Sequence, residues 1–192
     1  MTEMKPALLI VDMQNDFVLP GAPAAVKGAA ATIPRIKAVL DRFRRSGWPV
    51  FHVVREYRAD GSDIEISRRD AFLAGPGYVI PGTTGAEIVR ALSPESGEYR
   101  IVKPRFSAFF GTELELILRR LAVDRLVLCG TQYPNCIRAT AYDGLSHGYP
   151  VLVITDATSA SDDQVAEANI RDLRNVGIRC VSFEEFDRSI GG

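Results

Sequence analysis

Three side chains that can take part in nucleophilic or acid–base chemistry follow predicted strands. Cys136 comes after Pro134 at the start of a predicted helix, and proline is favoured in a first helical turn. The backbone N–H groups and partial positive charge of a helix N-terminus favour a thiolate. Asp12 directly follows five apolar residues, and Lys103 follows another predicted strand. A thiolate paired with a carboxylate base is a set that can attack a carbonyl group.

Each of these residues also has a structural interpretation. Asp12 taken alone is equally well explained as a helix cap, and Lys103 taken alone as a solvated surface lysine. Cys129 and Cys180 lie inside predicted strands, where we interpret them as small buried residues. A junction between strand, loop and helix exposes a side chain, so Cys136 is the candidate nucleophile.

Short, nearly continuous apolar runs must position these residues. Such runs are typical of parallel strands that helices cover on both faces. Segments with helical spacing alternate with them, and we expect Thr112 with Glu115, and Ser161 with Gln164, to cap two of the helices. The predicted strands are 7–11, 50–54, 126–129 and 151–154, with weaker ones at 99–102 and 179–181, and the predicted helices are 33–43, 114–121, 137–145 and 165–176.

The alternation of strands and helices predicts an α/β fold, a three-layer α-β-α sandwich with a mostly parallel, roughly six-stranded, Rossmann-like sheet. We expect one domain over residues 1–192. Ligands bind beyond the carboxyl ends of the strands in such sheets, where Asp12, Lys103, Cys136 and Asp156 are expected. Segment 56–81 is long, polar and Gly-rich, and a loop of that length is a functional cover or an interface arm.

Composition excludes several classes of protein. Hydrophobic residues make up 46% and charged residues 24%, as in an ordinary globular protein, and the net charge of −1 lacks the basic surface of a nucleic-acid binder. No apolar run approaches the roughly 20 residues that span a membrane, and we expect no signal peptide. Three widely spaced cysteines favour the cytoplasm. Only two histidines are present, so we expect no metal and no cofactor.

Four motifs lie in order along nearly the whole chain. They are VDMQNDF at 11–17, KPRFSAFFGTEL at 103–114, GTQYPNC at 130–136 and DAT at 156–158. Together they resemble the motifs of the isochorismatase-like, or cysteine hydrolase, superfamily. The resemblance implies a triad of Asp12, Lys103 and Cys136 that hydrolyses a small amide through a thioester. It also implies a cis Thr131–Gln132 peptide bond and an oxyanion hole made by the backbone N–H groups of Gln132 and Cys136.

The resemblance says less about the substrate, for which carboxamides, carbamoyl compounds and ureido compounds are all candidates. Phe17 matches a family position that contacts the substrate, although a packed core aromatic explains it equally well. Arg105, Phe109 and Tyr133 are further candidates for lining the pocket, and Phe109 is also explained as core. The arginines of the 56–81 region are interpreted as solvated or as subunit contacts, with a substrate carboxylate as the alternative partner of one of them: Arg55, Arg58, Arg68 and Arg69.

The chain also departs from parts of the superfamily. Nicotinamidases hold a metal with an Asp-x-His-Pro motif after the second strand, where this chain has VREYR at 54–58. We therefore expect no metal site, and nicotinamide is a less favoured substrate. His52 is interpreted as packed in a strand and His147 as a residue near a helix end. Relatives form dimers or tetramers, so the resemblance implies a homodimer or homotetramer.

Two other functions remain open. Isochorismatases cleave a vinyl ether by protonating it and need no nucleophilic cysteine, so alkylation of Cys136 would abolish amide hydrolysis but leave that reaction intact. The other alternative is a non-catalytic binding module. A low thiol pKa at Cys136 would weigh against such a module, because binding alone needs no activated thiol.

Overall fold

A computed structural model describes residues 4–190, and its centre is a six-stranded sheet in the order β3-β2-β1-β4-β5-β6. Every pair of neighbouring strands is parallel. The predicted α/β fold class is confirmed, with the sheet parallel throughout. The strands are β1 (Pro6–Val11), β2 (Val50–Arg55), β3 (Tyr99–Lys103), β4 (Arg125–Thr131), β5 (Val151–Ser159) and β6 (Arg179–Val181).

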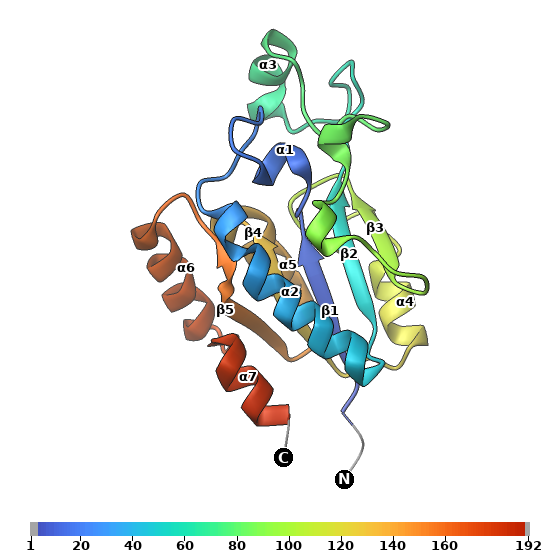
Figure 1. The fold of residues 1–192 in the computed structure, drawn as a ribbon, viewed down its shortest axis with the longest axis vertical. Coiled ribbons are helices and arrows are strands. Elements are labelled where there is room, and N and C mark those ends of the chain that lie inside the picture. Colours follow the sequence, from blue (N-terminus) through green and yellow to red (C-terminus); the bar gives the residue numbers. More distant parts are fainter. Residues whose placement is uncertain (1–3, 191–192) are drawn as a thin grey trace.

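Helices cover both faces of the sheet (Figure 1). One face packs against α2 and α7, and the other packs against α4, α5 and α6. The α3 helix stands clear of both layers, at the end to which the strand arrows point (Figure 1). The helices are α1 (Asn15–Val18), α2 (Ala29–Ser46), α3 (Ile66–Ala74), α4 (Leu114–Arg120), α5 (Arg138–Ser146), α6 (Asp163–Asn175) and α7 (Phe183–Ile190), with short 3₁₀ turns at Thr84–Ala86 and Arg90–Leu92 and a π turn at Tyr133–Ile137.

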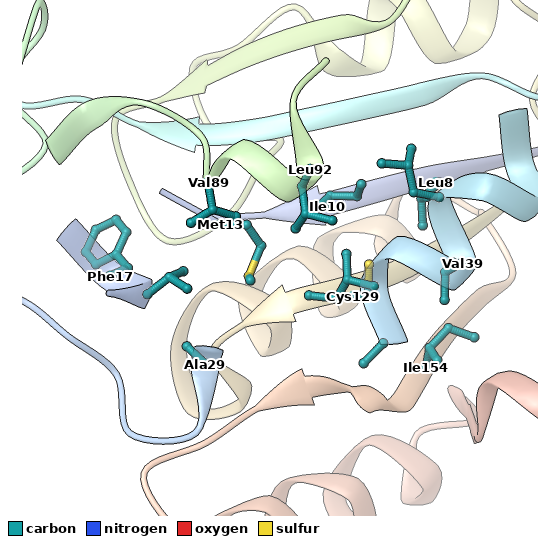
Figure 2. Packing of buried hydrophobic residues seen from close by; sticks show 14 of the residues in the cluster. Leu8, Ile10, Met13, Phe17, Ala29, Val39, Val89, Leu92, Cys129 and Ile154 are labelled. Atoms are coloured by element: carbon teal, nitrogen blue, oxygen red, sulfur yellow. The ribbon is translucent and has the colours of Figure 1, made fainter. Parts of the chain in front are cut away.

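The apolar run of β1 is buried on both sides, as a central parallel strand requires. Leu8 and Ile10 point into the core shared with α2 (Figure 2). Leu9 belongs to the core on the opposite face. The buried face of α2 carries Ile36, Val39, Leu40 and Phe43 at helical spacing. Burial of each such side chain contributes about 1.5–3 kcal/mol, so the two cores hold the sheet edge rigid for the site.

Several predicted details were wrong. Segment 56–81 contains a helix, α3, which the prediction missed because Phe72 is its one buried residue. The fifth strand continues to Ser159, so Asp156 lies within it rather than after it. Asp162, not Ser161, caps α6 by accepting a hydrogen bond from the Val165 N–H at 2.8 Å.

The expected capping box before α4 is also absent from the structure. The Thr112 hydroxyl accepts a bond from the Leu114 N–H at 3.3 Å, one position short of a capping box. Glu115 turns outward instead and pairs with Arg119 at 2.7 Å.

The central pair of strands, β1 and β4, approaches closely at its carboxyl end. Gly130 has a φ of +113°, and a Cβ atom there would lie 2.2 Å from the Val11 carbonyl oxygen. Only glycine allows this approach. The chain leaves β1 and β4 toward opposite neighbours, which makes this the point in a doubly wound sheet where ligands bind. Within residues 4–190 no helix is long and apolar enough to cross a membrane.

Candidate active site

Asp12, Lys103 and Cys136 come from three different strand ends and meet in one buried cluster. The Lys103 ammonium donates to Asp12 Oδ2 at 2.8 Å and lies 3.4 Å from Cys136 Sγ. The side chains of Lys103 and Asp12 are 0% and 4% exposed. In this setting a charged hydrogen bond is much stronger than at the surface, so the three groups form one unit.

The backbone and carboxylate of Asp12 both have features of a functional residue. Asp12 has a φ of +52°, in the left-handed region that a non-glycine residue adopts rarely, although Asp does so more readily than most. Its Oδ1 atom is buried and has no hydrogen-bond partner, whereas Oδ2 binds Lys103. A buried carboxylate oxygen without a partner is costly, and it is available to accept a proton.

Opposing effects act on the Cys136 thiol. Burial raises the pKa of Cys136, and the neighbouring Asp12 carboxylate raises it further. Lys103 and Arg55 oppose this change because each places a positive charge beside the sulfur. The net direction of the Cys136 pKa is upward. The unpaired Oδ1 atom belongs to Asp12, which lines the same cavity as Cys136.

Cys136 lies in the π turn rather than in the first turn of a regular α-helix. The turn runs from Tyr133 to Ile137 and leads directly into α5. The preceding Thr131–Gln132 peptide bond is cis. Gln132, Asn135 and Cys136 line the same small cavity as Asp12.

Arg55 is the functional candidate that the sequence did not single out. It was one of four arginines interpreted as solvated or as subunit contacts, with a substrate carboxylate as the alternative partner of one of them. Its side chain is instead 1% exposed at the end of β2. Its Nη2 atom lies 3.3 Å from Cys136 Sγ, and its Nη1 atom donates to the Tyr57 hydroxyl at 2.6 Å and to the Glu65 carboxylate. The Cys136 sulfur therefore has two cationic neighbours, Lys103 and Arg55.

The side chain of Gln14 holds the backbone at Arg55 in place. Gln14 Nε2 donates to the Arg55 carbonyl at 2.8 Å, and Gln14 Oε1 accepts from the Arg55 N–H at 2.7 Å. Nε2 also donates to the Ala86 carbonyl at 2.9 Å. The available indication of this role in the sequence was the position of Gln14 in the motif VDMQNDF, two residues after Asp12. The structure shows that its side chain is fully buried.

Of the four residues predicted to contact substrate, Phe17 lines the cavity, together with Val26 and Arg68. The other three do not line this cavity, although the Arg105 carbonyl accepts from the Lys103 ammonium at 3.4 Å. Phe109 belongs to the core and stacks on His147 at 4.8 Å. Arg105 donates to the backbone carbonyls of Asp63 and Pro104, each at 2.6 Å, and Tyr133 is buried beside another hollow near β5.

The histidines do not contribute to this cluster. His52 is buried in β2 and bonds Glu98 at 2.8 Å, and burial lowers its pKa. In the described part of the chain no three side chains of His, Cys, Asp or Glu are grouped so as to hold a metal ion. The donor set at Asp12, with Lys103 and Arg55 beside it, also does not suit a cation.

Comparison with known proteins gives a consistent result. Residues 6–185 match the family model described as the isochorismatase domain. An Arabidopsis thaliana protein named "Probable inactive nicotinamidase" is 43% identical over 96% of this chain and 95% of its own length. Maleamate amidohydrolase from Pseudomonas putida is 32% identical over 88% of this chain and 79% of its own.

The structure of this chain is also similar to a solved structure. An isochorismatase family protein from Desulfovibrio vulgaris superposes with a TM-score of 0.95 at 55% identity, and the match covers 99% of this chain and 100% of that one. The order and direction of the strands and the positions of the helices are thus common to both chains.

Proposed function

Because this chain belongs to the isochorismatase family, we propose that it is a hydrolase that cleaves the C–N bond of a small amide by means of a nucleophilic cysteine. Asp12, Lys103 and Cys136 form the catalytic triad of this proposal. One observation supports it best. Lys103 contacts both Asp12 and Cys136, while Asp12 Oδ1 is buried without a partner. A general base and a nucleophile, joined by a cation, are the parts that acyl transfer needs.

The proposed reaction proceeds in two halves. Asp12 takes the proton of the Cys136 thiol, and the thiolate attacks the amide carbonyl carbon. The tetrahedral intermediate collapses, the C–N bond breaks, and Asp12 returns the proton to the departing amine or ammonia. Water then attacks the thioester with Asp12 as base, which releases the carboxylic acid and restores the thiol.

Charge on the substrate oxygen also needs donors. We assign this role to the backbone N–H groups of Gln132 and Cys136, since both residues border the cavity that Asp12 lines. Backbone donors are fixed before the reaction starts, and loss of one such donor in other enzymes costs about 3–4 kcal/mol of transition-state stabilisation.

The cavity supports a small substrate held in part by an aromatic surface. Phe17 lines it and is 8% exposed, so its ring is available on one side. Arg105, Phe109 and Tyr133 would reach a substrate only after a change in the surrounding loops. The substrate class includes carboxamides, carbamoyl compounds and ureido compounds. The similarity to maleamate amidohydrolase favours a small amide as the substrate. The proposed reaction uses no cofactor.

Two other functions compete with this proposal. Vinyl-ether cleavage would need an acid but would give the Cys136 sulfur no role, although Lys103 and Arg55 both contact it. A non-catalytic module is favoured by the printed name of the Arabidopsis relative, which calls that protein a probable inactive nicotinamidase. Against it stands the buried Lys103–Asp12 pair beside a thiol, which a binding module has no reason to keep.

A panel of small amides with ammonia as the measured product tests the proposal. Wild type, Cys136→Ala and Cys180→Ala are compared, because Cys180 is a buried thiol in β6 away from the cavity. We expect wild type and Cys180→Ala to turn over the same amide and Cys136→Ala to be inactive. Equal turnover by the Cys136→Ala variant would remove the cysteine from the mechanism and favour the vinyl-ether reaction.

We also propose that the chain forms a homodimer or homotetramer. Two apolar side chains of α3 support this proposal, since Ile66 is 93% exposed and Leu73 is 48% exposed. Exposed apolar groups that lie together mark association surfaces. Light scattering on the wild type and on Ile66→Glu tests it, and a monomeric wild type at micromolar concentration would contradict it.

A further inference from the structure

Arg55 lies between the nucleophile and the segment that carries α3. Its guanidinium contacts Cys136 Sγ through Nη2 at 3.3 Å, and it contacts Tyr57 and Glu65 through Nη1. Glu65 directly precedes the first residue of α3. Arginine presents its donors in a rigid planar fork, so one side chain can bind both groups without moving.

We propose that Arg55 is a fourth member of the catalytic group, which touches the reacting sulfur and, with Lys103, holds the negative charge of the Cys136 thiolate. In this proposal Glu65 and Tyr57 fix the guanidinium in place, and the charge of Glu65 limits how strongly Arg55 acts. The inference rests on the proposed function only in taking Cys136 as the nucleophile.

The placement of the donors supports this role over a purely structural one. An ion pair that only anchored segment 56–81 would need the contacts of Nη1 with Glu65. Here Nη2 is directed at sulfur, which is a weak acceptor as a thiol and a strong one as a thiolate. The contact therefore gains strength when the thiol loses its proton, and catalysis depends on such a gain.

The surrounding rings keep water from weakening the interaction. The Arg55 guanidinium lies over the Phe106 ring at 5.3 Å and over the Tyr57 ring at 5.4 Å. Burial alone would lower the pKa of Arg55, but the anionic groups around it, with Asp12 foremost, hold its pKa above the usual value. Arg55 is thus charged at every pH at which the enzyme is folded.

Other charged groups near the Cys136 sulfur also affect its pKa, so a test must separate their effects from that of Arg55. Asp12 and Lys103 face it from β1 and β3, and Glu65 and Arg68 belong to the segment around α3. Burial raises the pKa of Glu65, but its bonds to Tyr57 and Arg55 lower it by more, so Glu65 is ionised. Neutralising Glu65 and removing Arg55 should therefore change the thiol pKa in opposite directions.

The test measures the rate of Cys136 alkylation by iodoacetamide against pH, by mass spectrometry and without substrate. Arg55→Met removes the charge, Arg55→Lys keeps a charge, and Glu65→Gln removes the anion but keeps an acceptor. The control is Arg58→Met, which removes a solvent-exposed arginine of the same segment. Circular dichroism shows that each variant is folded.

We expect Arg55→Met to raise the Cys136 pKa by about 1–3 units, as the loss of an opposite charge within contact distance does. Arg55→Lys should restore part of this shift, Glu65→Gln should lower the pKa, and Arg58→Met should leave it unchanged. An unchanged pKa in Arg55→Met, or a rise in Glu65→Gln equal to that in Arg55→Met, would overturn the proposal.

A second variant covers the case in which Arg55→Met does not fold because Glu65 is left buried without its partner. Arg55→Met/Glu65→Gln removes both charges, and its Cys136 pKa should still exceed that of the wild type because Arg55 is the group in contact with sulfur. A pKa at or below the wild-type value would overturn the proposal. Absence of amide turnover in the wild type would contradict the proposed function but would leave this measurement intact.

Discussion

Gly130 lies so close to Val11 that a Cβ atom would sit 2.2 Å from the Val11 carbonyl oxygen and 2.7 Å from its nitrogen. Val11 is the last residue before Asp12, and Gly130 lies near the end of β4, six residues before Cys136. The contact therefore lies between the strand that leads to Asp12 and the strand that leads to Cys136. It joins the two central strands where their chains diverge.

Gly130→Ala should destabilise the protein strongly and abolish activity, because backbone atoms cannot yield to the new methyl group. Gly148→Ala is the matched control, since Gly148 also has a positive φ, of +84°, but no atom within 4 Å of its Cβ position. The control should cost about 1–2 kcal/mol for the left-handed backbone alone. Urea unfolding should show a larger loss in Gly130→Ala, and equal losses would contradict the close-approach argument.

Lys103→Met should destabilise the protein by about 3–5 kcal/mol, because the buried Asp12 carboxylate would lose its partner. The double variant Asp12→Asn/Lys103→Met should recover part of that loss, since no unpaired charge remains, yet it should stay inactive. Chemical unfolding of both single variants and of the double variant gives the coupling energy. Additive losses would show that the two groups do not interact.

Gln14→Leu should cost about 3 kcal/mol, because it leaves the N–H and carbonyl of Arg55 and the carbonyl of Ala86 without a partner in the interior. Asn15→Ala is the comparison, because the Asn15 side chain makes a single exposed bond to Thr84. Thermal or urea unfolding should separate the two variants clearly. Similar stabilities would mean that water replaces the amide of Gln14.

Glu98 should make stability depend on acid pH. Its carboxylate accepts bonds from Arg44 at 2.7 and 2.9 Å and from His52 at 2.8 Å. Burial alone would raise its pKa, but the bonds from Arg44, the Glu95 N–H and His52 together outweigh this effect and lower the pKa to about 2. The unfolded state binds the proton more tightly, so this stabilisation is complete above the usual glutamate pKa and is lost as pH falls toward 2.

Glu98→Gln should therefore lower the free energy of unfolding by about 2 kcal/mol at neutral pH, with a difference from wild type that shrinks steadily below pH ~4.5. Urea unfolding at a series of pH values measures that difference. A gap that stays constant down to pH ~2 would show that the carboxylate charge contributes nothing.

The parts of the fold that follow from local pattern were predictable. Continuous apolar runs identified four of the strands, and the weaker candidates at 99–102 and 179–181 correspond to β3 and β6. Helical spacing identified α2, α4, α5 and α6, but it missed α7, which buries Phe186 in the core on the α2 side. The α3 helix was not predictable in this way, since Phe72 alone is buried on it. Helix caps were misplaced by one residue at Asp162, because several polar residues in succession can each serve as a cap.

The residues of the candidate site likewise include some that local sequence pattern predicts and one that it does not. The positions of Asp12, Lys103 and Cys136 after strands, together with the family motifs, were sufficient to group them. Arg55 was not identifiable, because an arginine beside a polar stretch has the same local pattern whether solvated or buried. Its burial depends on Gln14 and Glu65, whose partners become evident only when distant parts of the chain are placed together.

The sheet order has a consequence for how the protein is made. β1 is synthesised first but occupies the middle of the sheet, with β2 on one edge and β4 on the other. As the chain leaves the ribosome, β2 and β3 can pair beside β1 before β4 has been synthesised. During that time the backbone N–H and carbonyl groups on the other edge of β1 have no partner strand. Such edges invite pairing with other chains. Asp12 can meet Cys136 only after that edge is closed, so the cluster of Asp12, Lys103 and Cys136 cannot form until β4 has been synthesised.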